Sequence, residues 1–411
     1  MEAKSVLDVL KERGFVQQIT DEENLPGILA GEKVAVYIGF DPTADSLHIG
    51  SLIPIMSLMH MQQHGHLPIV VLGGGTAMVG DPSGKTEMRK MLYRDQINIH
   101  GEMFKKQLNR YLHFDEGKAV AVNNVDWLIG LNYIDFLRDI GRHFSVNRML
   151  TAEAYKIRLE TGLSFLEFNY QLLQAYDFLM LYKQHACKLQ MGGDDQWGNI
   201  VAGIDLIRRV EGGQAYGITF PLLQTATGQK MGKTVKGAIW LDGDKTSPFE
   251  FYQYWINVDD RDVKRFLAFF TLLPMDEVER LGALQGADIR EAKKVLAFEA
   301  TQITHGKREA IKAQEASNSA FGNCQYGLSG IPTTAFSKIE LENGINVVDL
   351  LLKVNLVASK SDARRLIQQG GCYLNDARVE SIELLINLSN LINETILLRA
   401  GKKKYHRITV S

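Results

Sequence analysis

The sequence contains little cysteine and no long hydrophobic run. Its three cysteines, Cys187, Cys324 and Cys372, lie far apart, and none belongs to a C-x-x-C pair. A structural zinc site needs closely spaced thiols, and a disulfide-stabilised secreted domain needs many more cysteines. We therefore expect reduced thiols, no structural zinc and a cytoplasmic protein.

The sequence also shows no pattern typical of a membrane-spanning helix or of a targeting segment. No stretch approaches the roughly 20 apolar residues that a membrane-spanning helix needs. Residues 1–15 mix acids with bases in an amphipathic pattern, unlike a secretory signal or an acid-poor transit peptide. The sequence thus predicts no membrane partner.

Charge of either sign is not in excess, with 46 Lys and Arg against 48 Asp and Glu and a net charge of −2. This balance alone argues against a nucleic-acid partner. The range 353–411, however, carries ten basic and five acidic residues, a net +5 that leaves −7 for the rest of the chain. A basic end on an acidic body is what a contact with a phosphate backbone needs.

A length of 411 residues predicts two or three domains. Near the start, a β-branched and aromatic strand at 34–40 leads through a turn to a helix that begins near His48 and ends at Gly65. A second buried strand follows at 68–72. Strand, helix and strand at this spacing form a right-handed crossover, so we predict an α/β fold with a doubly wound, Rossmann-type parallel sheet.

The turn between the strand and the helix, within residues 34–51, predicts a phosphate site. In a parallel sheet, nucleotides bind at the carboxyl ends of the strands, where a helix N-terminus offers unpaired N–H groups and a positive dipole. The alternative is an ordinary strand, turn and helix with His48 as a helix cap.

The segment GDPSGKT at residues 80–86 suggests a P-loop. A P-loop needs four residues between its two glycines, whereas Gly80 and Gly84 have three between them and Val79 occupies the required position. The match fails by one residue, so we do not interpret the segment as a P-loop.

The predicted helix at 165–184 carries Tyr170, Gln174 and Asp177 on one face, at positions i, i+4 and i+7. The other faces are apolar nearly all round, which predicts a buried helix. A polar stripe on a buried helix needs partners. It either satisfies a neighbouring strand or lines a pocket.

A short strand within residues 188–200 ends at Gly192 and Gly193, and a helix begins near Asn199. This is again a strand end that suits a nucleotide. Gly192 allows close approach of a ribose or adenine, and Asp195 is placed to accept from ribose hydroxyls. A tight turn with acidic caps is the alternative.

Four segments in this order resemble the signatures of class I aminoacyl-tRNA synthetases: HIGS at 48–51, GDPSGK at 80–85, GGDDQWGN at 192–199 and KMGKT at 230–234. Alone, the lysines of the last segment would suit a solvated turn. With Tyr37 and the polar helix face, the chain resembles the bacterial-type tyrosyl-tRNA synthetase family over essentially its whole length. The resemblance implies an enzyme that activates L-tyrosine with ATP, releases pyrophosphate and transfers tyrosine to the 3′ end of tRNA(Tyr).

The implied chemistry needs no general base, because the attacking carboxylate is already an anion. Catalysis then rests on positioning and on charge stabilisation at the phosphates. The resemblance assigns Thr43 and His48 to the α-phosphoryl transition state. It assigns to the pyrophosphate Lys85, Arg89, Lys230, Lys233 and Thr234. Mg²⁺ is expected to arrive with ATP, without a dedicated protein metal site.

The resemblance also implies the substrate contacts. The tyrosine pocket would comprise Tyr37 and Asp177 at the phenol hydroxyl, Asp81, Tyr170 and Gln174 at the ammonium, and Gln196 nearby. The ATP site would comprise Gly39, Asp41, Gly50, Ser51, Gly192, Asp195 and Lys233. Ser51 departs from the family, which most often has a second histidine there, and a serine can donate a hydrogen bond but cannot carry a proton charge.

The predicted domains are a catalytic domain at 1–228, a KMSKS-like loop with an all-α tRNA-binding domain at 229–321, a linker at 322–343 and an S4-like RNA-binding domain at 344–411. A helical insertion at about 121–160 has more apolar surface than it can bury itself. Core packing and a subunit contact both explain this surface, and the resemblance favours a homodimer.

The C-terminal domain should contain a helix that is capped by Ser359 or Ser361, stopped at Gly370 and followed by a strand. The predicted RNA-binding residues are Lys360, Arg364, Arg365, Lys402, Lys403 and Lys404. A small α+β domain with a solvated basic face is the alternative.

Other function classes remain open at this point. They are the related tryptophanyl enzyme, an unrelated nucleotidyltransferase, and a non-enzymatic RNA-binding module with a decayed synthetase fold. Tyr37, Asp177 and the S4-like tail favour tyrosine, and the retained His48 and signature lysines argue against decay.

Overall fold

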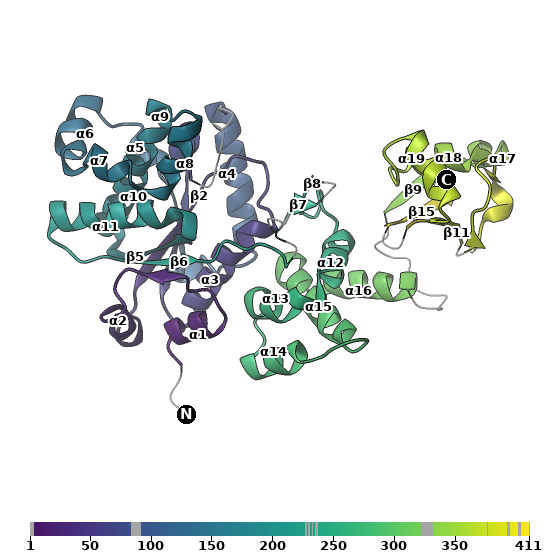
Figure 1. Ribbon diagram of the computed structural model, residues 1–411, viewed down its shortest axis with the longest axis horizontal. Coiled ribbons are helices and arrows are strands. Elements are labelled where there is room, and N and C mark those ends of the chain that lie inside the picture. Colours follow the sequence, from purple (N-terminus) through teal and green to yellow (C-terminus); the bar gives the residue numbers. More distant parts are fainter. Residues whose placement is uncertain are drawn as a thin grey trace. The chain divides into compact units, whose positions relative to one another are not determined.

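A computed structural model describes residues 4–83, 92–226, 228, 231, 233–234, 237–321, 332–375, 377–392, 395–401 and 404–410. The chain forms two compact units (Figure 1). The first comprises Met1–Thr246 and Val258–His305, and the second comprises Ser247–Asn257 and Gly306–Ser411. In the described part of the chain, no helix is both long enough and apolar enough to cross a membrane.

A six-stranded sheet forms the centre of the first unit, in the order β1-β6-β5-β2-β3-β4. The strands are β1 (Gln18–Ile19), β2 (Ala35–Phe40), β3 (Leu67–Leu72), β4 (Val120–Asn123), β5 (Cys187–Gly193) and β6 (Tyr216–Phe220). Only the pairing of β1 with β6 is antiparallel, and the other neighbours are parallel. This confirms the predicted doubly wound α/β fold, with an antiparallel strand added at one edge.

The order places β2 beside β5, although the chain first builds outward from β2 through β3 and β4. This is the switch point of a doubly wound sheet, where a crevice opens at the carboxyl ends of the strands. Nearly every residue of β3 and β6 is buried, which requires cover on both faces of the sheet. The main covering helices are α3 (Leu52–Gln63), α4 (Arg94–Leu108), α10 (Tyr170–His185) and α11 (Trp197–Glu211) (Figure 1).

The range predicted as a helical insertion, 121–160, begins in the sheet. Residues 120–123, which include the β-branched Val120 and Val122, pair with β3, so β4 replaces the expected helix there. Short helices follow: α5 (Val125–Leu128), α6 (Tyr133–Asp139), α7 (Val146–Met149) and α8 (Glu153–Thr161). Trp127 and Phe136 are buried in the core, whereas Ile134 is exposed. Core packing therefore explains part of the apolar surface, and the subunit contact stays a prediction for the exposed side chains.

The helix predicted at 165–184 is divided into α9 (Phe165–Phe168) and α10, with Asn169 between them. Ser164 caps α9 in a reciprocal pair with Glu167. Glu167 also forms a buried ion pair with Arg158, whose Nη2 lies 3.0 Å from its carboxylate. This pair fixes the chain immediately before Tyr170, the first residue of the polar helix face.

The helices after the loop do not form one domain, in contrast to the prediction for 229–321. α13 (Val263–Phe270), α14 (Met275–Gly282) and α15 (Ile289–His305) belong to the first unit, where α13 packs against α3. α12 (Pro248–Ile256) and α16 (Lys307–Phe321) belong to the second unit. There Phe249 packs with Ala316 and Tyr405. Ser247 and Glu250 form a capping box that starts α12.

The second unit is built on a five-stranded sheet in the order β12-β11-β14-β15-β9. Its strands are β9 (Thr333–Phe336), β11 (Cys372–Leu374), β12 (Ala377–Arg378), β14 (Thr395–Ala400) and β15 (Lys404–Val410), and a separate pair consists of β10 (Ile345–Asn346) and β13 (Leu385–Ile386). The helices are α17 (Lys338–Glu342), α18 (Val347–Lys353) and α19 (Lys360–Gln368).

The predicted linker at 322–343 is wrong for its described part, because residues 333–342 form β9 and α17. β9 pairs in parallel with β15, and Phe336 is buried in the core of the unit. Ser337 and Glu340 form a capping box that starts α17. The Gly, Ser, Thr and Pro content of this range predicted a linker and obscured both signals. Ser359 caps α19, and Gly370 has a φ of 71°, as expected for its end.

Candidate active site

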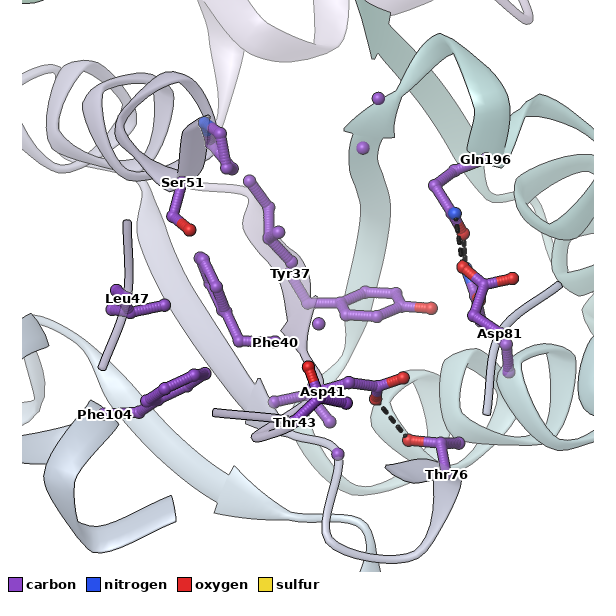
Figure 2. A pocket seen from close by; sticks show the side chains of 18 of the residues that line it. Tyr37, Phe40, Asp41, Thr43, Leu47, Ser51, Thr76, Asp81, Phe104 and Gln196 are labelled. Carbon is purple, nitrogen blue, oxygen red and sulfur yellow. Dashed lines mark hydrogen bonds between the residues drawn. The ribbon is translucent and has the colours of Figure 1, made fainter. Parts of the chain in front are cut away.

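A cavity of about 320 Å³ opens at the switch point, at the carboxyl ends of β2 and β5. Figure 2 shows Tyr37 pointing into it, with Asp41 hydrogen-bonded to Thr76 and Asp81 beside Gln196. The predicted site residues that line it are Tyr37, Gly39, Asp41, Thr43, His48, Gly50, Ser51, Asp81, Tyr170, Gln174, Asp177, Gly192 and Gln196. The fold therefore brings together residues from three of the four signature segments and from the polar face of α10.

At one end of the cavity Tyr37 is 2% exposed and packs against the ring of Phe178, with ring centroids 5.1 Å apart. Its hydroxyl has no hydrogen-bond partner among the described residues. Burial, together with the nearby Asp177 carboxylate, raises the pKa of Tyr37 well above its usual value. The hydroxyl is therefore a neutral donor that a bound group can satisfy.

Asp177 is buried at the same end and is held by two side chains. Trp127 donates from Nε1 to one carboxylate oxygen at 2.7 Å, and Asn124 donates from Nδ2 to the other at 2.9 Å. Burial raises the pKa of Asp177 to about 7, although both hydrogen bonds act in the opposite direction. The sequence analysis missed the roles of Asn124 and Trp127. Their position just after β4 is the signal that could have revealed them.

A second cluster of polar side chains lies around Asp81. Gln196 donates to the Asp81 carboxylate at 2.7 Å and accepts from Gln174 at 3.1 Å. Asn199, which was not predicted as a site residue, donates to Gln174 and Gln196 at 3.1 and 3.0 Å. Asp81 has no cationic partner within the part of the chain that the structure describes. This end of the cavity can therefore receive a cation.

A chain of hydrogen bonds crosses the cavity between these two ends. The Tyr170 hydroxyl donates to Asp41 at 2.9 Å, and Thr76 donates to the other Asp41 oxygen at 2.7 Å. Asn124 donates to Thr76 at 3.0 Å and continues the chain to Asp177. Asp41, predicted as an ATP contact, thus also supports Tyr170. Gly73 is required here because a Cβ would lie 1.9 Å from an Asp41 oxygen.

Residues 41–51 form the turn that joins β2 to α3, the signature turn. Thr43 and His48 are both exposed in it. The N–H of Gly50 donates to Nδ1 of His48 at 3.0 Å, so a neutral ring carries its proton on Nε2. His48 therefore presents a hydrogen-bond donor at a helix N-terminus, where negative charge is favoured. Gln107 of α4 holds this turn from behind by accepting from the N–H of Leu47 at 3.0 Å.

Gln190 was also missed by the sequence analysis. It lies on β5 opposite Tyr37, lines the cavity and is 3% exposed. Its Oε1 has no hydrogen-bond partner among the described residues. A single amide within the buried strand sequence KLQM is the signal that could have identified it.

Asp195 does not line the cavity, in contrast to its neighbour Gln196. The adjacent Asp194 accepts from Gln18 and Thr219 and so fixes the end of β5 to the strands beside it. The ribose contact predicted for Asp195 stays a prediction.

The last signature segment is only partly described. Lys230 lies outside the described residues, as do Lys85 and Arg89. The backbone of Lys233 and Thr234 forms β7, which pairs with β8 (Gly237–Ala238). The next residues return to the signature turn: Ile239 accepts from the N–H of Ile49 and Leu241 donates to Leu47, both at 2.9 Å.

The predicted RNA-binding cations all belong to the second unit: Lys360, Arg364, Arg365, Lys402, Lys403 and Lys404. Lys360 and Arg365 form surface ion pairs with Asp349 and Asp362. Arg364 is exposed on α19, and the Nζ of Lys404 donates to a backbone carbonyl. Lys402 and Lys403 lie outside the described residues.

Residues 239–241, which follow the last signature segment, form backbone hydrogen bonds with Leu47 and Ile49 of the signature turn, which contains the first one. These bonds bring both segments to the switch point. This arrangement, on a doubly wound sheet, is the one expected for the catalytic domain of a class I aminoacyl-tRNA synthetase. Two family sequence models match the chain accordingly. The tRNA synthetases class I (W and Y) match residues 29–322, and the tyrosine–tRNA ligase SYY-like C-terminal domain matches residues 323–408.

Full-length relatives agree with these matches. A tyrosine–tRNA ligase of Caldanaerobacter subterraneus subsp. tengcongensis is 58% identical over 409 residues, which cover 99% of each chain. A tyrosine–tRNA ligase of Acetivibrio thermocellus is 55% identical over 406 residues, which cover 98% of this chain and 99% of that one. The chain therefore belongs to the class I tRNA synthetases of the W and Y family, which confirms the resemblance predicted from its motifs.

A solved structure is also similar. A C-terminally truncated mitochondrial tyrosyl-tRNA synthetase of Aspergillus nidulans has 31% sequence identity and a TM-score of 0.70. The match covers 77% of this chain and 94% of that chain.

The raised pKa of Asp177 predicts a pH dependence of stability in the absence of ligand. An aspartate in the unfolded chain titrates near about 3.9, whereas the folded value is about 7. The stability that the protonated group contributes is complete below about pH 4 and is lost as the pH rises to about 7, at roughly 1.4 kcal/mol per pH unit. Asp177→Asn should remove this slope. Thermal unfolding of both proteins from pH 4 to 8 measures it, and parallel curves would contradict the assignment.

Proposed function

We propose that the chain is a tyrosine–tRNA ligase. It activates L-tyrosine with ATP to tyrosyl-adenylate, releases pyrophosphate and transfers the tyrosine to the 3′ end of tRNA(Tyr). Two observations support this function: the sequence identity of 55–58% to tyrosine–tRNA ligases over nearly the whole chain, and the polar cavity at the switch point.

The single observation that carries the proposal is the buried Tyr37 hydroxyl, which has no partner among the described residues, at the end of the cavity that Asp177 lines. A phenol hydroxyl both accepts and donates, so it can accept from Tyr37 and donate to Asp177. Phenylalanine would leave the Tyr37 hydroxyl buried without a partner and would offer Asp177 no donor, which is costly. The indole N–H of tryptophan only donates, so it would satisfy Asp177 and leave Tyr37 without a partner.

The opposite end suits the ammonium group of an amino acid. Asp81 supplies a carboxylate, and its orientation is fixed by the hydrogen bond from Gln196, which in turn accepts from Gln174. The Tyr170 hydroxyl donates to Asp41, and a hydroxyl oxygen can also accept a hydrogen bond from an ammonium group. We assign Asp81, Tyr170 and Gln174 to the ammonium, with Gln196 beside them.

At the phosphates, we assign Thr43 and His48 to the developing charge at the α-phosphorus, where a donor from Nε2 and the start of α3 favour an anion. We assign the pyrophosphate to Lys85, Arg89, Lys230, Lys233 and Thr234. Gly39, Asp41, Gly50, Ser51, Gly192 and Asp195 complete the proposed ATP contacts. Among the described residues no group of three His, Cys, Asp or Glu is arranged to hold a metal ion. Mg²⁺ would therefore be held chiefly by the phosphates of ATP, whose charge it would reduce.

We also infer a homodimer. Apolar side chains that are exposed in the single chain occur on α6, α7, α8 and α9 and at the residue just after α5: Ile129, Tyr133, Ile134, Leu137, Val146, Leu159, Phe165 and Leu166. Exposed apolar surface of this extent is typical of an interface. Sedimentation at the mass of one chain would exclude it. The tRNA contacts of the second unit and the cytoplasmic location remain predictions.

The proposed phenol contacts predict a specific loss of selectivity. Tyr37→Phe and Asp177→Ala should lower the preference for tyrosine over phenylalanine by about 10- to 100-fold each, because each removes a buried hydrogen bond to the substrate hydroxyl. The affinity for ATP should change much less. Tyrosine- and phenylalanine-dependent ATP–pyrophosphate exchange measures both.

No tyrosine-dependent exchange in the unaltered protein would exclude the proposed function. An unchanged selectivity ratio in both variants, with the unaltered protein active, would exclude only the assignment of the two residues.

Ser51 and His48 should differ in importance. Ser51→Ala should slow adenylate formation about 2- to 5-fold, because a hydroxyl contributes one neutral hydrogen bond of roughly 0.5–1 kcal/mol. His48→Ala should slow it by about 100-fold or more, because it removes a donor aimed at the developing charge. Single-turnover adenylate formation with saturating tyrosine measures both rates. Equal losses would show that Ser51 has a direct catalytic role.

A further inference from the structure

The signature loop between β6 and β8 is held at its two ends by different parts of the first unit. Its returning end, residues 239–241, pairs with the backbone of the signature turn. Its leading end, residues 224–226, forms hydrogen bonds with side chains at the start of α13.

Asp262 makes the main contact with the leading end. One carboxylate oxygen accepts from the N–H of Ala226 at 2.8 Å, and the other accepts from Arg265 at 2.7 Å. Asp262 is 3% exposed and, as the N-cap of α13, uses no side-chain bond to cap the helix. Its carboxylate is thus committed to the loop and to Arg265.

Arg265 supports the same contact. Its Nη2 donates to the carbonyl of Gln224 at 2.6 Å as well as to Asp262. The two side chains therefore engage a carbonyl and an N–H two residues apart on the leading end. The carboxylate of this ion pair is buried, and both of its oxygens accept hydrogen bonds. Such a pair is more rigid than an ion pair that is exposed to solvent.

The helix that carries this pair is itself fixed to two other elements of the first unit, Arg13 at the end of α1 (Val6–Glu12) and helix α3. Arg13 is 6% exposed and donates from Nη1 to the carbonyls of Ala268 and Thr271, both at 2.9 Å. It also donates to the carbonyl of Leu273. These contacts satisfy carbonyls at the C-terminal end of α13, and α13 packs against α3, the helix that follows His48.

The described residue in the middle of the loop lies beside the reaction centre. Met231 is 7% exposed, and its N–H donates to the carbonyl of Leu223 on the leading end at 3.2 Å. Its own carbonyl lies 4.0 Å from the position that a Cβ on Gly50 would take. The position of the leading end therefore bears on where the backbone of Met231 lies relative to Gly50.

We propose that Asp262, supported by Arg265, is a positioning residue for adenylate formation. It fixes the leading end of the loop so that the backbone at Met231 meets the signature turn. This inference rests on the proposed function. Asp262 touches neither tyrosine nor ATP in this arrangement and acts only through the loop. Its removal should therefore affect the step that uses the loop and not the binding of tyrosine.

Asp262→Ala should lower kcat/KM for ATP in pyrophosphate exchange by about 10- to 100-fold. The substitution removes a buried, charge-assisted hydrogen bond and also leaves Arg265 without its carboxylate partner. The dissociation constant for tyrosine, measured by equilibrium dialysis, should stay within about 2-fold. Rates are expressed per active site, which the burst of pyrophosphate release on the first turnover counts. A variant that merely folds less well would lose active sites without changing the rate of each.

Asp259→Ala is the matched control. Asp259 lies in the same short turn before α13 and pairs with Arg261 through two hydrogen bonds of 2.9 Å, but neither side chain bonds to the loop in the described structure. The Asp259→Ala variant should therefore leave kcat/KM for ATP unchanged. Asp262→Asn keeps one oxygen that can accept from Ala226 but places an NH2 donor against Arg265, so it should recover only part of the activity that Asp262→Ala loses.

The proposal is overturned if Asp262→Ala has an unaltered kcat/KM for ATP per active site, or if Asp259→Ala lowers it equally. A loss of tyrosine affinity in parallel with the loss of rate would also overturn it, because the effect would then not be confined to the loop. Tyrosine-dependent exchange by the unaltered protein is measured first, so a failure of the proposed function is seen separately.

Discussion

The hydrogen-bonded chain from Tyr170 through Asp41, Thr76 and Asn124 to Asp177 is the interaction on which the rest of the site depends. It joins side chains from α10, the end of β2 and the segments after β3 and β4. A buried carboxylate is stable only if its oxygens accept hydrogen bonds, so these elements have to meet in one arrangement. The consequence is a rigid cavity wall in which the Tyr37 hydroxyl, without a partner among the described residues, is left for a ligand.

Most of this site could be predicted from the sequence because its residues occur in short signatures at strand ends. The turn at His48, the glycines at 192–193 and the polar face of α10 each follow from local periodicity and from the rule that parallel strands end at one edge. The structure brings nearly all of them to one cavity. The family resemblance assigned Asp41 to ATP alone. Its hydrogen bond with Tyr170 was not predicted, because it joins residues 129 positions apart and leaves no local pattern.

The parts that the sequence did not reveal depend on contacts between distant segments. Asn124 and Trp127 were not assigned to the site, because nothing near them in the sequence indicates Asp177. Gln190 was hidden in a buried strand. The range 333–342 looked like a linker because its composition is that of a loop, while its strand is stabilised only by pairing with β15. Contacts between Asp262 and the loop are of the same long-range kind.

The central claim is that the end of the cavity formed by Tyr37 and Asp177 receives a hydroxyl group that both accepts and donates. A crystal structure of the protein with bound L-tyrosine tests this most directly. The account predicts that the phenol oxygen lies about 2.5–3.0 Å from both the Tyr37 hydroxyl and an Asp177 carboxylate oxygen. A phenol oxygen beyond hydrogen-bond distance of both groups, or a tyrosine bound with its ammonium at this end, would contradict it.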